Sequence, residues 1–162
     1  MKNLLLLLLF SFLCTYAEAC TGYVVAFKGL NDAFDVKAFN VYVERLGYCS
    51  KTFSWQESKK ALKYINQLNK PYQLYGFSKG AGTISYVLRH VISKPEFVIT
   101  IGAYRTTNVD FTPYKVNFVN FFDESGKGQK SPGIYLDVKH FEMQNEVNKI
   151  NGGLSGLGPA RS

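Results

Sequence analysis

The sequence predicts an α/β protein built on a doubly wound, mostly parallel sheet of about six strands, with helices on both faces. Two observations lead to this interpretation: one predicts the fold class and the other predicts a single domain. Short apolar runs alternate along most of the chain with segments whose apolar residues recur at helical spacing. The chain also has 162 residues, of which 46% are hydrophobic. That is enough for one well-packed domain and too little for two.

The first half of the chain supplies three predicted strands, at residues 22–27, 47–53 and 72–77, with two helices between them. Ser54 and Glu57 have the spacing of a capping box and predict the start of the second helix, and Pro71 ends it. The apolar residues that mark the two helices are Val36, Phe39, Val43 and Leu46, then Ala61, Leu62, Ile65 and Leu68.

The second half continues the alternation. A third helix follows strand 72–77, and further strands are predicted at residues 97–101, 116–122 and 133–138. A last helix is expected to close at Gly152 and Gly153. The apolar residues that mark these two helices are Ile84, Val87, Leu88 and Val91, then Met143, Val147 and Ile150.

The two ends of the chain are predicted to lie outside a folded domain of residues 20–150. Residues 1–19 combine one lysine, an unbroken apolar run and small residues at Ala17 and Ala19, the pattern of a secretory signal peptide cleaved before Cys20. A lipoprotein signal with Cys20 acylated is the alternative. Residues 151–162 are rich in glycine and predict a flexible tail. The protein is therefore expected to be exported, to the periplasm or beyond.

Export gives the cysteines a predicted role. Cys14 leaves with the signal peptide, so Cys20 and Cys49 remain, and in an oxidising compartment two cysteines usually pair. They precede or open two strands that should be neighbours, so a bridge would clamp the N-terminus away from the functional edge of the sheet. A free, buried Cys49 is the alternative if Cys20 carries lipid.

The formal net charge of +7 favours anionic surfaces such as phospholipid head groups, with simple solubility as the other explanation. No dense cluster of basic residues with interleaved aromatics occurs, so nucleic acid is not expected as a partner. No His or Cys cluster has ligand spacing, so the sequence predicts neither a metal nor a cofactor.

In a parallel sheet, ligands bind beyond the carboxyl ends of the strands, so the residues that follow each strand indicate function. Ser78 follows strand 72–77 within the stretch GFSKG, Asp123 follows strand 116–122, and His140 follows strand 133–138. Each is a residue type that nucleophilic catalysis needs: a nucleophile, an acid and a base. Ser78 as a small turn residue and His140 as the start of a helix are the structural alternatives.

These residues resemble the α/β-hydrolase superfamily. GFSKG matches the G-x-S-x-G nucleophile elbow of that superfamily, and the chain order serine, acid, histidine is also the same. The resemblance implies Ser78 as nucleophile, His140 as general base and Asp123 as the acid that orients it. It also implies an oxyanion hole made by the backbone N–H groups of Leu30 and Lys79. Glu124 and Asp110 remain alternatives for the acid.

The sequence departs from the family pattern in ways that matter. The loop after the first strand reads Lys28–Gly29 where the family often has His-Gly, and the two leading strands of the family are missing. The loop after strand 97–101 spans only residues 102–115, which leaves no room for a cap domain. The chain is in these respects similar to cutinase-like esterases and small thioesterases. Aromatic candidates for an acyl groove, with ordinary packing as the alternative for each, are Tyr104, Phe111, Tyr114 and Tyr135.

The sequence therefore predicts an exported, monomeric serine hydrolase that cleaves carboxylic esters or thioesters, including lipid or envelope esters, through an acyl-serine intermediate. Amidase or acyltransferase chemistry would use the same residues. A catalytically inactive binding module that docks to an anionic envelope surface is the alternative from another class, because fold does not fix function. A structural lipoprotein held by acylated Cys20 is a third.

Overall fold

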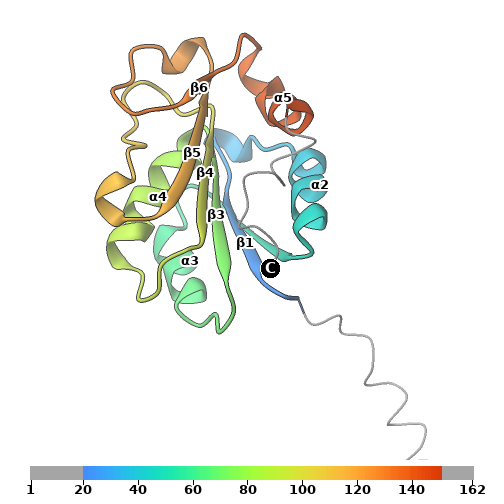
Figure 1. The fold of residues 1–162 in the computed structure, drawn as a ribbon, viewed down its shortest axis with the longest axis vertical. Helices are drawn as coiled ribbons and strands as arrows, with labels where there is room; N and C mark the ends of the chain where they lie inside the picture. The colour runs from blue at the N-terminus through green and yellow to red at the C-terminus, as the bar shows by residue number, and fades with distance from the viewer. Residues whose placement is uncertain (1–19, 151–162) are drawn as a thin grey trace, which may run out of the picture.

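A computed structural model of the chain describes residues 20–150 as one α/β domain (Figure 1). The predicted signal peptide, the predicted glycine-rich tail and the expected helix closure at Gly152 and Gly153 lie outside these residues. Within residues 20–150, no helix is both long enough and apolar enough to cross a membrane.

All six strands belong to a single sheet and every neighbouring pair is parallel, which confirms the predicted fold class. The strand order is β2-β1-β3-β4-β5-β6. The order reverses between β1 and β3, so the loops that leave these two strands diverge, and open α/β sheets bind ligands at such a point. The strand bounds are β1 Tyr23–Phe27, β2 Cys49–Phe53, β3 Tyr72–Phe77, β4 Phe97–Ile101, β5 Asn117–Phe122 and β6 Ile134–Tyr135.

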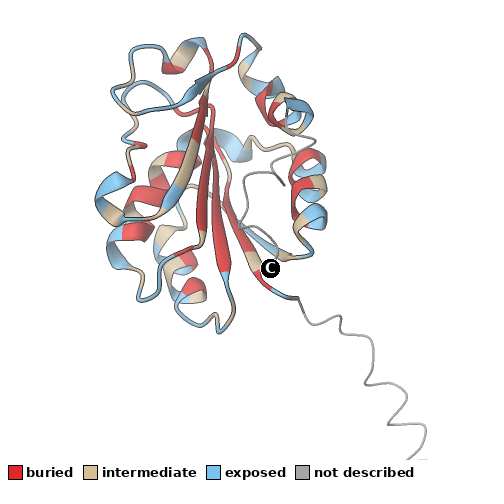
Figure 2. Ribbon diagram, viewed as in Figure 1, coloured by how far each residue is buried: buried red, intermediate tan, exposed pale blue. Residues whose placement is uncertain are grey.

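Helices cover both faces of this sheet (Figure 1). On one face lie α2 (Val36–Leu46) and α5 (Met143–Ile150), and on the other lie α3 (Ser58–Ile65) and α4 (Lys79–His90). The central strands β1, β3 and β4 are buried almost throughout (Figure 2), because their side chains fill a separate apolar core on each face. Four short 3-10 turns complete the domain, at Leu30–Asp32, Thr112–Tyr114, Glu124–Gly126 and His140–Glu142.

The last strand is shorter than the sequence predicts, with two residues in place of the expected 133–138. The register explains the difference. Ile134 pairs with Phe121 and Tyr135 with Phe122, the last residue of β5. One more hydrogen bond follows, from the Leu136 N–H to the Phe122 carbonyl, before β5 gives way to a turn and offers no further partner.

The second predicted helix is also shorter than expected. The Glu57 carboxylate does accept a hydrogen bond from the Ser54 N–H at 2.9 Å, as half of a capping box would require. The Ser54 side chain caps nothing, however, and residues 54–57 close a turn, so α3 begins only at Ser58. At the other end it stops at Ile65, and tighter turn hydrogen bonds carry the chain on to Leu68.

The predicted disulfide between Cys20 and Cys49 is present, with 5.5 Å between the two Cα atoms. It joins the residue before β1 to the first residue of β2. The bridge therefore lies at the amino ends of the strands, opposite their carboxyl ends. Closing a loop of 29 residues restricts the unfolded chain and stabilises a fold by about 3–4 kcal/mol in the chain-entropy model. The bridge therefore holds the N-terminus without touching the candidate site.

Candidate active site

Ser78 sits on a sharp turn between β3 and α4. Its φ of 52° and ψ of −120° are rare for a residue with a side chain and are typical of a strained strand-to-helix elbow. The glycines on either side, Gly76 and Gly80, are required because other backbone atoms lie too close to leave room for a side chain. A Cβ on Gly80 would lie 2.2 Å from the Phe27 carbonyl oxygen, and one on Gly76 would lie 2.7 Å from the Cα of Ala81. The elbow therefore holds the Ser78 hydroxyl at the N-terminus of α4.

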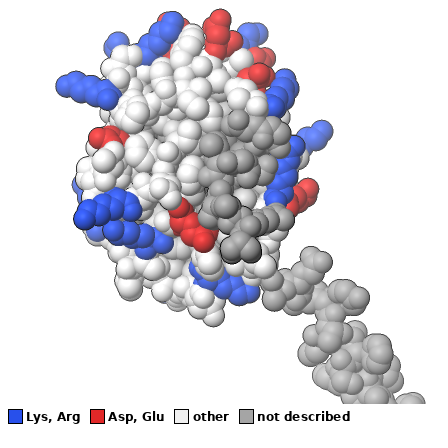
Figure 3. Space-filling view, in the orientation of Figure 1, with Lys and Arg blue, Asp and Glu red and all other residues white. Residues whose placement is uncertain are grey.

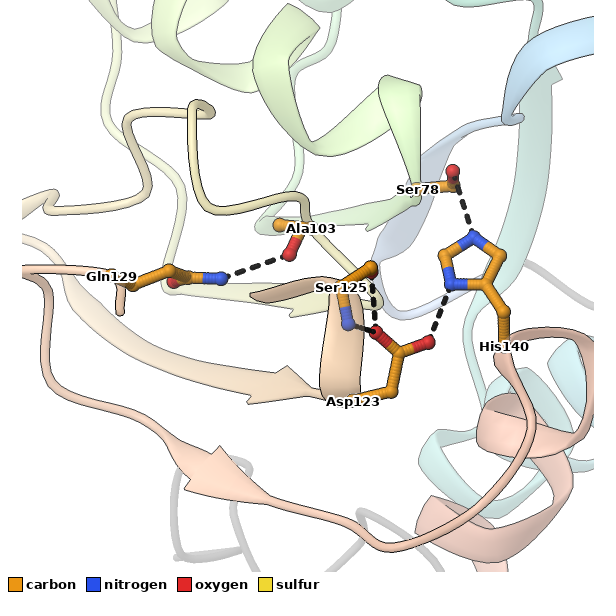
Figure 4. A network of polar contacts seen from close by, with 6 residues as sticks. All are labelled: Ser78, Ala103, Asp123, Ser125, Gln129 and His140. Carbon is orange, nitrogen blue, oxygen red and sulfur yellow. Dashed lines mark hydrogen bonds and ion pairs between the residues drawn. The ribbon is translucent and has the colours of Figure 1, made fainter. Parts of the chain in front are cut away.

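The structure brings Ser78, His140 and Asp123 into one hydrogen-bonded line (Figure 4). The Oγ of Ser78 is 3.0 Å from the Nε2 of His140. The other ring nitrogen, Nδ1, is 2.7 Å from the Oδ2 of Asp123. Both the serine and the aspartate are almost completely buried. This is the relation between hydroxyl, imidazole and carboxylate that lets a histidine remove the serine proton.

The Asp123 carboxylate is oriented by Ser125. The Ser125 N–H and hydroxyl both donate to Oδ1, at 2.9 and 2.5 Å, which leaves Oδ2 free for His140. Burial alone would raise the pKa of Asp123, but the hydrogen bonds from Ser125 and His140 outweigh it and hold the pKa below its usual value. The same loop is tied to the segment that follows β4 by the Gln129 amide, which donates to the Ala103 carbonyl at 2.8 Å (Figure 4).

The His140 ring is held between aromatic side chains and one glycine. Phe77 and Tyr104 lie against it with ring centroids 5.3 and 5.5 Å away, the Tyr104 ring nearly parallel to it. Gly102 has a φ of +68°, and a Cβ there would lie 2.9 Å from His140 Cε1. Any larger residue at position 102 would be strained and would also push the imidazole away from its partners.

Leu30 and Lys79, whose backbone N–H groups are expected to form an oxyanion hole, both lie beside Ser78. Lys79 is the first residue of α4, where N–H groups have no partner within the helix. Leu30 opens the 3-10 turn after β1, and the preceding Gly29 packs so closely that a Cβ on it would be 3.0 Å from the Ser78 Cβ. A developing oxyanion at Ser78 would thus meet backbone donors and the positive end of a helix dipole.

The alternative acids occupy other positions. Glu124 forms an ion pair with Lys127 at 2.5 Å, and its pKa is lowered by that contact. Asp110 accepts a hydrogen bond from the Thr112 N–H at 3.0 Å in the loop after β4, and its pKa is lowered in turn. Of the three carboxylates considered, Asp123 is the one that contacts His140.

The other histidine, His90, lies exposed at the end of α4 with Nδ1 2.7 Å from the Tyr86 carbonyl oxygen. In the part of the chain that the structure describes, no group of three or more His, Cys, Asp or Glu side chains could hold a metal ion.

Of the aromatic residues considered for an acyl groove, only Tyr104 lies at the site. Phe111 is wholly buried in the core between the sheet and α4, and Tyr114 packs against the same core, so ordinary packing, the alternative given for each candidate, describes these two. Tyr135 is at the edge of the sheet, where its hydroxyl donates to Glu124 at 3.1 Å.

Sequence reasoning missed several residues that shape the site. Ser125 could have been recognised from its place two residues after Asp123, since Asp commonly accepts from the backbone two positions on. Phe141 follows His140 directly, and 72% of its surface is exposed. Its ring meets the His140 ring edge to face at 5.5 Å. No local signal marks Gly102, whose role depends on a contact far along the chain.

Comparison with known proteins places the fold. No protein-family model matches the chain, and no curated protein matches its sequence. An inferred hydrolase of the alpha/beta superfamily from Xanthomonas campestris pv. campestris matches 85% of this chain and 97% of its own, with a TM-score of 0.58 and 13% identity. The chain has the α/β-hydrolase fold. An inferred YdeN-like hydrolase from Pectobacterium atrosepticum matches 72% of this chain and 77% of its own, with a TM-score of 0.48 and 12% identity.

The α/β-hydrolase fold appears here in a small form. The first neighbour is matched over nearly its whole length, so it too contains little beyond this core. In the present chain the segment between β4 and β5 carries just one 3-10 turn, Thr112–Tyr114. Identity this low shows a shared fold and leaves the reaction to be argued from the site.

Proposed function

We propose that the protein is an exported serine hydrolase that cleaves carboxylic esters or thioesters through an acyl-Ser78 intermediate. The observation that carries the proposal is the hydrogen-bonded line from Ser78 through His140 to Asp123. The strained elbow and the α/β-hydrolase fold support it, because in this fold the elbow is where the nucleophile lies. Export rests on the predicted signal peptide and is consistent with the disulfide.

The proposed reaction follows from the geometry. His140 Nε2 takes the Ser78 proton as Oγ attacks the carbonyl carbon, and Asp123 stabilises the imidazolium that forms. The carbonyl oxygen becomes an oxyanion beside the N–H groups of Leu30 and Lys79. His140 then returns the proton to the leaving alcohol or thiol as its bond to carbon breaks. Water attacks the acyl-Ser78 ester by the same steps, giving a carboxylic acid and restoring the serine.

Exposed apolar side chains around the site favour an ester with an apolar acyl group. Leu30, Tyr104 and Phe141 are 51, 45 and 72% exposed, and the last two contact the His140 ring. Leaving such side chains in water is unfavourable, so an acyl chain that covers them gains roughly 0.8 kcal/mol per buried methylene. Lipid or envelope esters are the natural members of this class outside the cytoplasm.

The first test is labelling of the mature protein with a fluorophosphonate probe, which reacts only with an activated serine. We expect the wild type to label and both Ser78→Ala and His140→Ala to lose labelling, because one removes the nucleophile and the other its base. Hydrolysis of p-nitrophenyl butyrate should fall in parallel, by about 10⁶-fold for each variant if the residues act as a unit. A folded wild type that does not label would favour the binding-module alternative.

A second prediction concerns acyl length. We expect Phe141→Ala to lower kcat/KM for p-nitrophenyl octanoate by roughly five-fold and to leave the butyrate ester nearly unaffected, because only a longer chain reaches the exposed ring. Ile92→Ala is the matched control, since Ile92 is 85% exposed in the loop that follows α4, away from the strand exits. An equal loss for both esters in Phe141→Ala would argue against an acyl-binding role.

Docking to an anionic surface stays a prediction from the net charge. On the face shown in Figure 3, basic side chains are spread around the edge rather than gathered in one patch, with acidic side chains among them. A charge arrangement of this kind supports weak, general attraction more than a dedicated binding site.

A further inference from the structure

The way in which His140 is held in place is unusual for a residue that must be positioned accurately. The strand before it, β6, pairs over only two residues, and the last main-chain hydrogen bond to β5 is made by Leu136. His140 then opens the 3-10 turn His140–Glu142, which runs directly into α5 at Met143. The ring is packed by residues at the ends of the sheet, but the backbone that carries it is anchored through α5.

The N-terminal turn of α5 is anchored by a buried glutamine. Gln144 is only 1% exposed. Its Oε1 accepts a hydrogen bond from the Asp35 N–H at 2.7 Å, and its Nε2 donates to the Tyr75 hydroxyl at 3.1 Å and to the Asp35 carbonyl at 3.4 Å. The amide thus uses its acceptor and both of its donors, as a buried polar group must if its burial is not to be costly.

The hydrogen-bond partners of Gln144 lie at the start of α2 and on β3. Asp35 is the N-cap of α2 and accepts from the Ala38 N–H at 2.8 Å, so it is itself fixed. Tyr75 lies on β3, three residues before Ser78, and is almost fully buried. Gln144 lies four residues after His140. The Gln144 side chain therefore links the segment that carries His140 to the strand that leads to Ser78.

We propose that Gln144 is a positioning residue that sets the distance and alignment between His140 Nε2 and Ser78 Oγ. The inference rests on the proposed serine hydrolase function, since it assigns Gln144 a role in that reaction. Gln144 touches no reacting atom. It acts through the backbone of the turn His140–Glu142, by keeping the start of α5 against Asp35 and Tyr75.

Other polar contacts hold α5 without involving the histidine and supply a control. The Asn148 amide donates to the Ala38 carbonyl at 2.7 Å, one helical turn beyond Gln144. This bond joins the same two helices, α5 and α2, so its loss also weakens the docking of α5. Asn148→Ala therefore separates general docking of α5 from placement of His140.

The variants that test the proposal are Gln144→Met, Gln144→Glu and Asn148→Ala in the mature protein. Methionine keeps the volume and removes every hydrogen bond. Glutamate keeps the shape, can accept from the Asp35 N–H and can share a hydrogen bond with the Tyr75 hydroxyl. Thermal unfolding reports the stability of each variant. The functional readouts are kcat and KM for p-nitrophenyl butyrate, and the NMR signal of the His140 Nδ1 proton in the bond to Asp123, which needs no activity.

We expect Gln144→Met to lower kcat about ten-fold with KM nearly unchanged, since a small misplacement of a catalytic group is costly. Its Nδ1 proton signal should broaden through exchange with water. Gln144→Glu should recover part of kcat, and Asn148→Ala should match the wild type in both readouts while losing stability. A Gln144→Met protein with wild-type kcat and a sharp signal, or an equal loss of kcat in Asn148→Ala, would overturn the proposal.

The proposed function and the role of Gln144 fail in different ways. An inactive wild type would remove the hydrolase function, and the Nδ1 proton signal would still decide whether Gln144 positions His140. If Gln144→Met does not fold, Gln144→Glu carries the comparison: a partial loss of kcat and a broadened Nδ1 signal, both absent from Asn148→Ala, would support the proposal, because glutamate loses the donor to the Asp35 carbonyl. A Gln144→Glu protein that equals Asn148→Ala in both readouts would count against it.

Discussion

Asp123→Asn is expected to lower kcat for p-nitrophenyl butyrate by about 10⁴-fold, with little change in KM. The carboxylate accepts a hydrogen bond from His140 Nδ1 at 2.7 Å, which keeps the proton on Nδ1 and leaves Nε2 free to take the serine proton. An asparagine amide can donate to Nδ1 instead, which favours the tautomer with its proton on Nε2. That tautomer cannot act as the base, and the imidazolium also loses its counter-charge.

The other two carboxylates are the matched controls. Glu124→Gln removes an exposed ion pair with Lys127, and Asp110→Asn weakens one contact in a surface loop. Changes of this kind have small effects, so both variants should keep kcat within roughly two-fold of the wild type. Steady-state kinetics of the three variants on the same ester makes the comparison. A large loss in Glu124→Gln together with an active Asp123→Asn would show that the acid is assigned to the wrong residue.

The sequence allowed the site to be located because parallel strands all end at the same edge of the sheet. Ser78 and His140 are 62 residues apart, yet each follows a strand of that sheet. Alternation of apolar runs therefore carried enough information to expect these residues close together. It favoured Asp123, which follows strand 116–122 directly, and left Glu124 and Asp110 as alternatives. That choice depends on Ser125, whose hydrogen bonds turn one oxygen of Asp123 toward the histidine.

What the sequence could not show depends on contacts between distant residues. The shortness of β6 follows from where β5 ends, and periodicity within residues 133–138 does not contain that information. In the sequence, Gly102 looks like any other glycine that follows a strand. Its role becomes evident only from its contact with His140 in the folded protein. Gln144 looks like a polar residue on an ordinary helix, and its burial becomes evident only when α2 and β3 surround it.

Gly80→Ala is expected to destabilise the protein by about 3 kcal/mol, at the upper end of the cost of overpacking. A Cβ at this position would lie 2.2 Å from the Phe27 carbonyl oxygen and 2.7 Å from that of Lys28. Both atoms are backbone and cannot rotate aside, so α4 must move away from the end of β1. Thermal unfolding should show a midpoint lower by about 10 °C. Fluorophosphonate labelling of the folded protein should also slow by about 10²-fold, as expected for a displaced oxyanion donor.

Gly82→Ala tests whether this effect is specific to the close approach. Gly82 lies in the same helix two residues on, and its added Cβ would meet only the Thr107 methyl group, at an ordinary 3.6 Å. Alanine is a better helix former than glycine, so this variant should be more stable than the wild type by about 0.5–1 kcal/mol and should label normally. Two variants with similar midpoints would mean that the end of β1 does not press against α4. The loop with Leu30 would then not be held beside Ser78, and the proposed oxyanion hole would lose its structural basis.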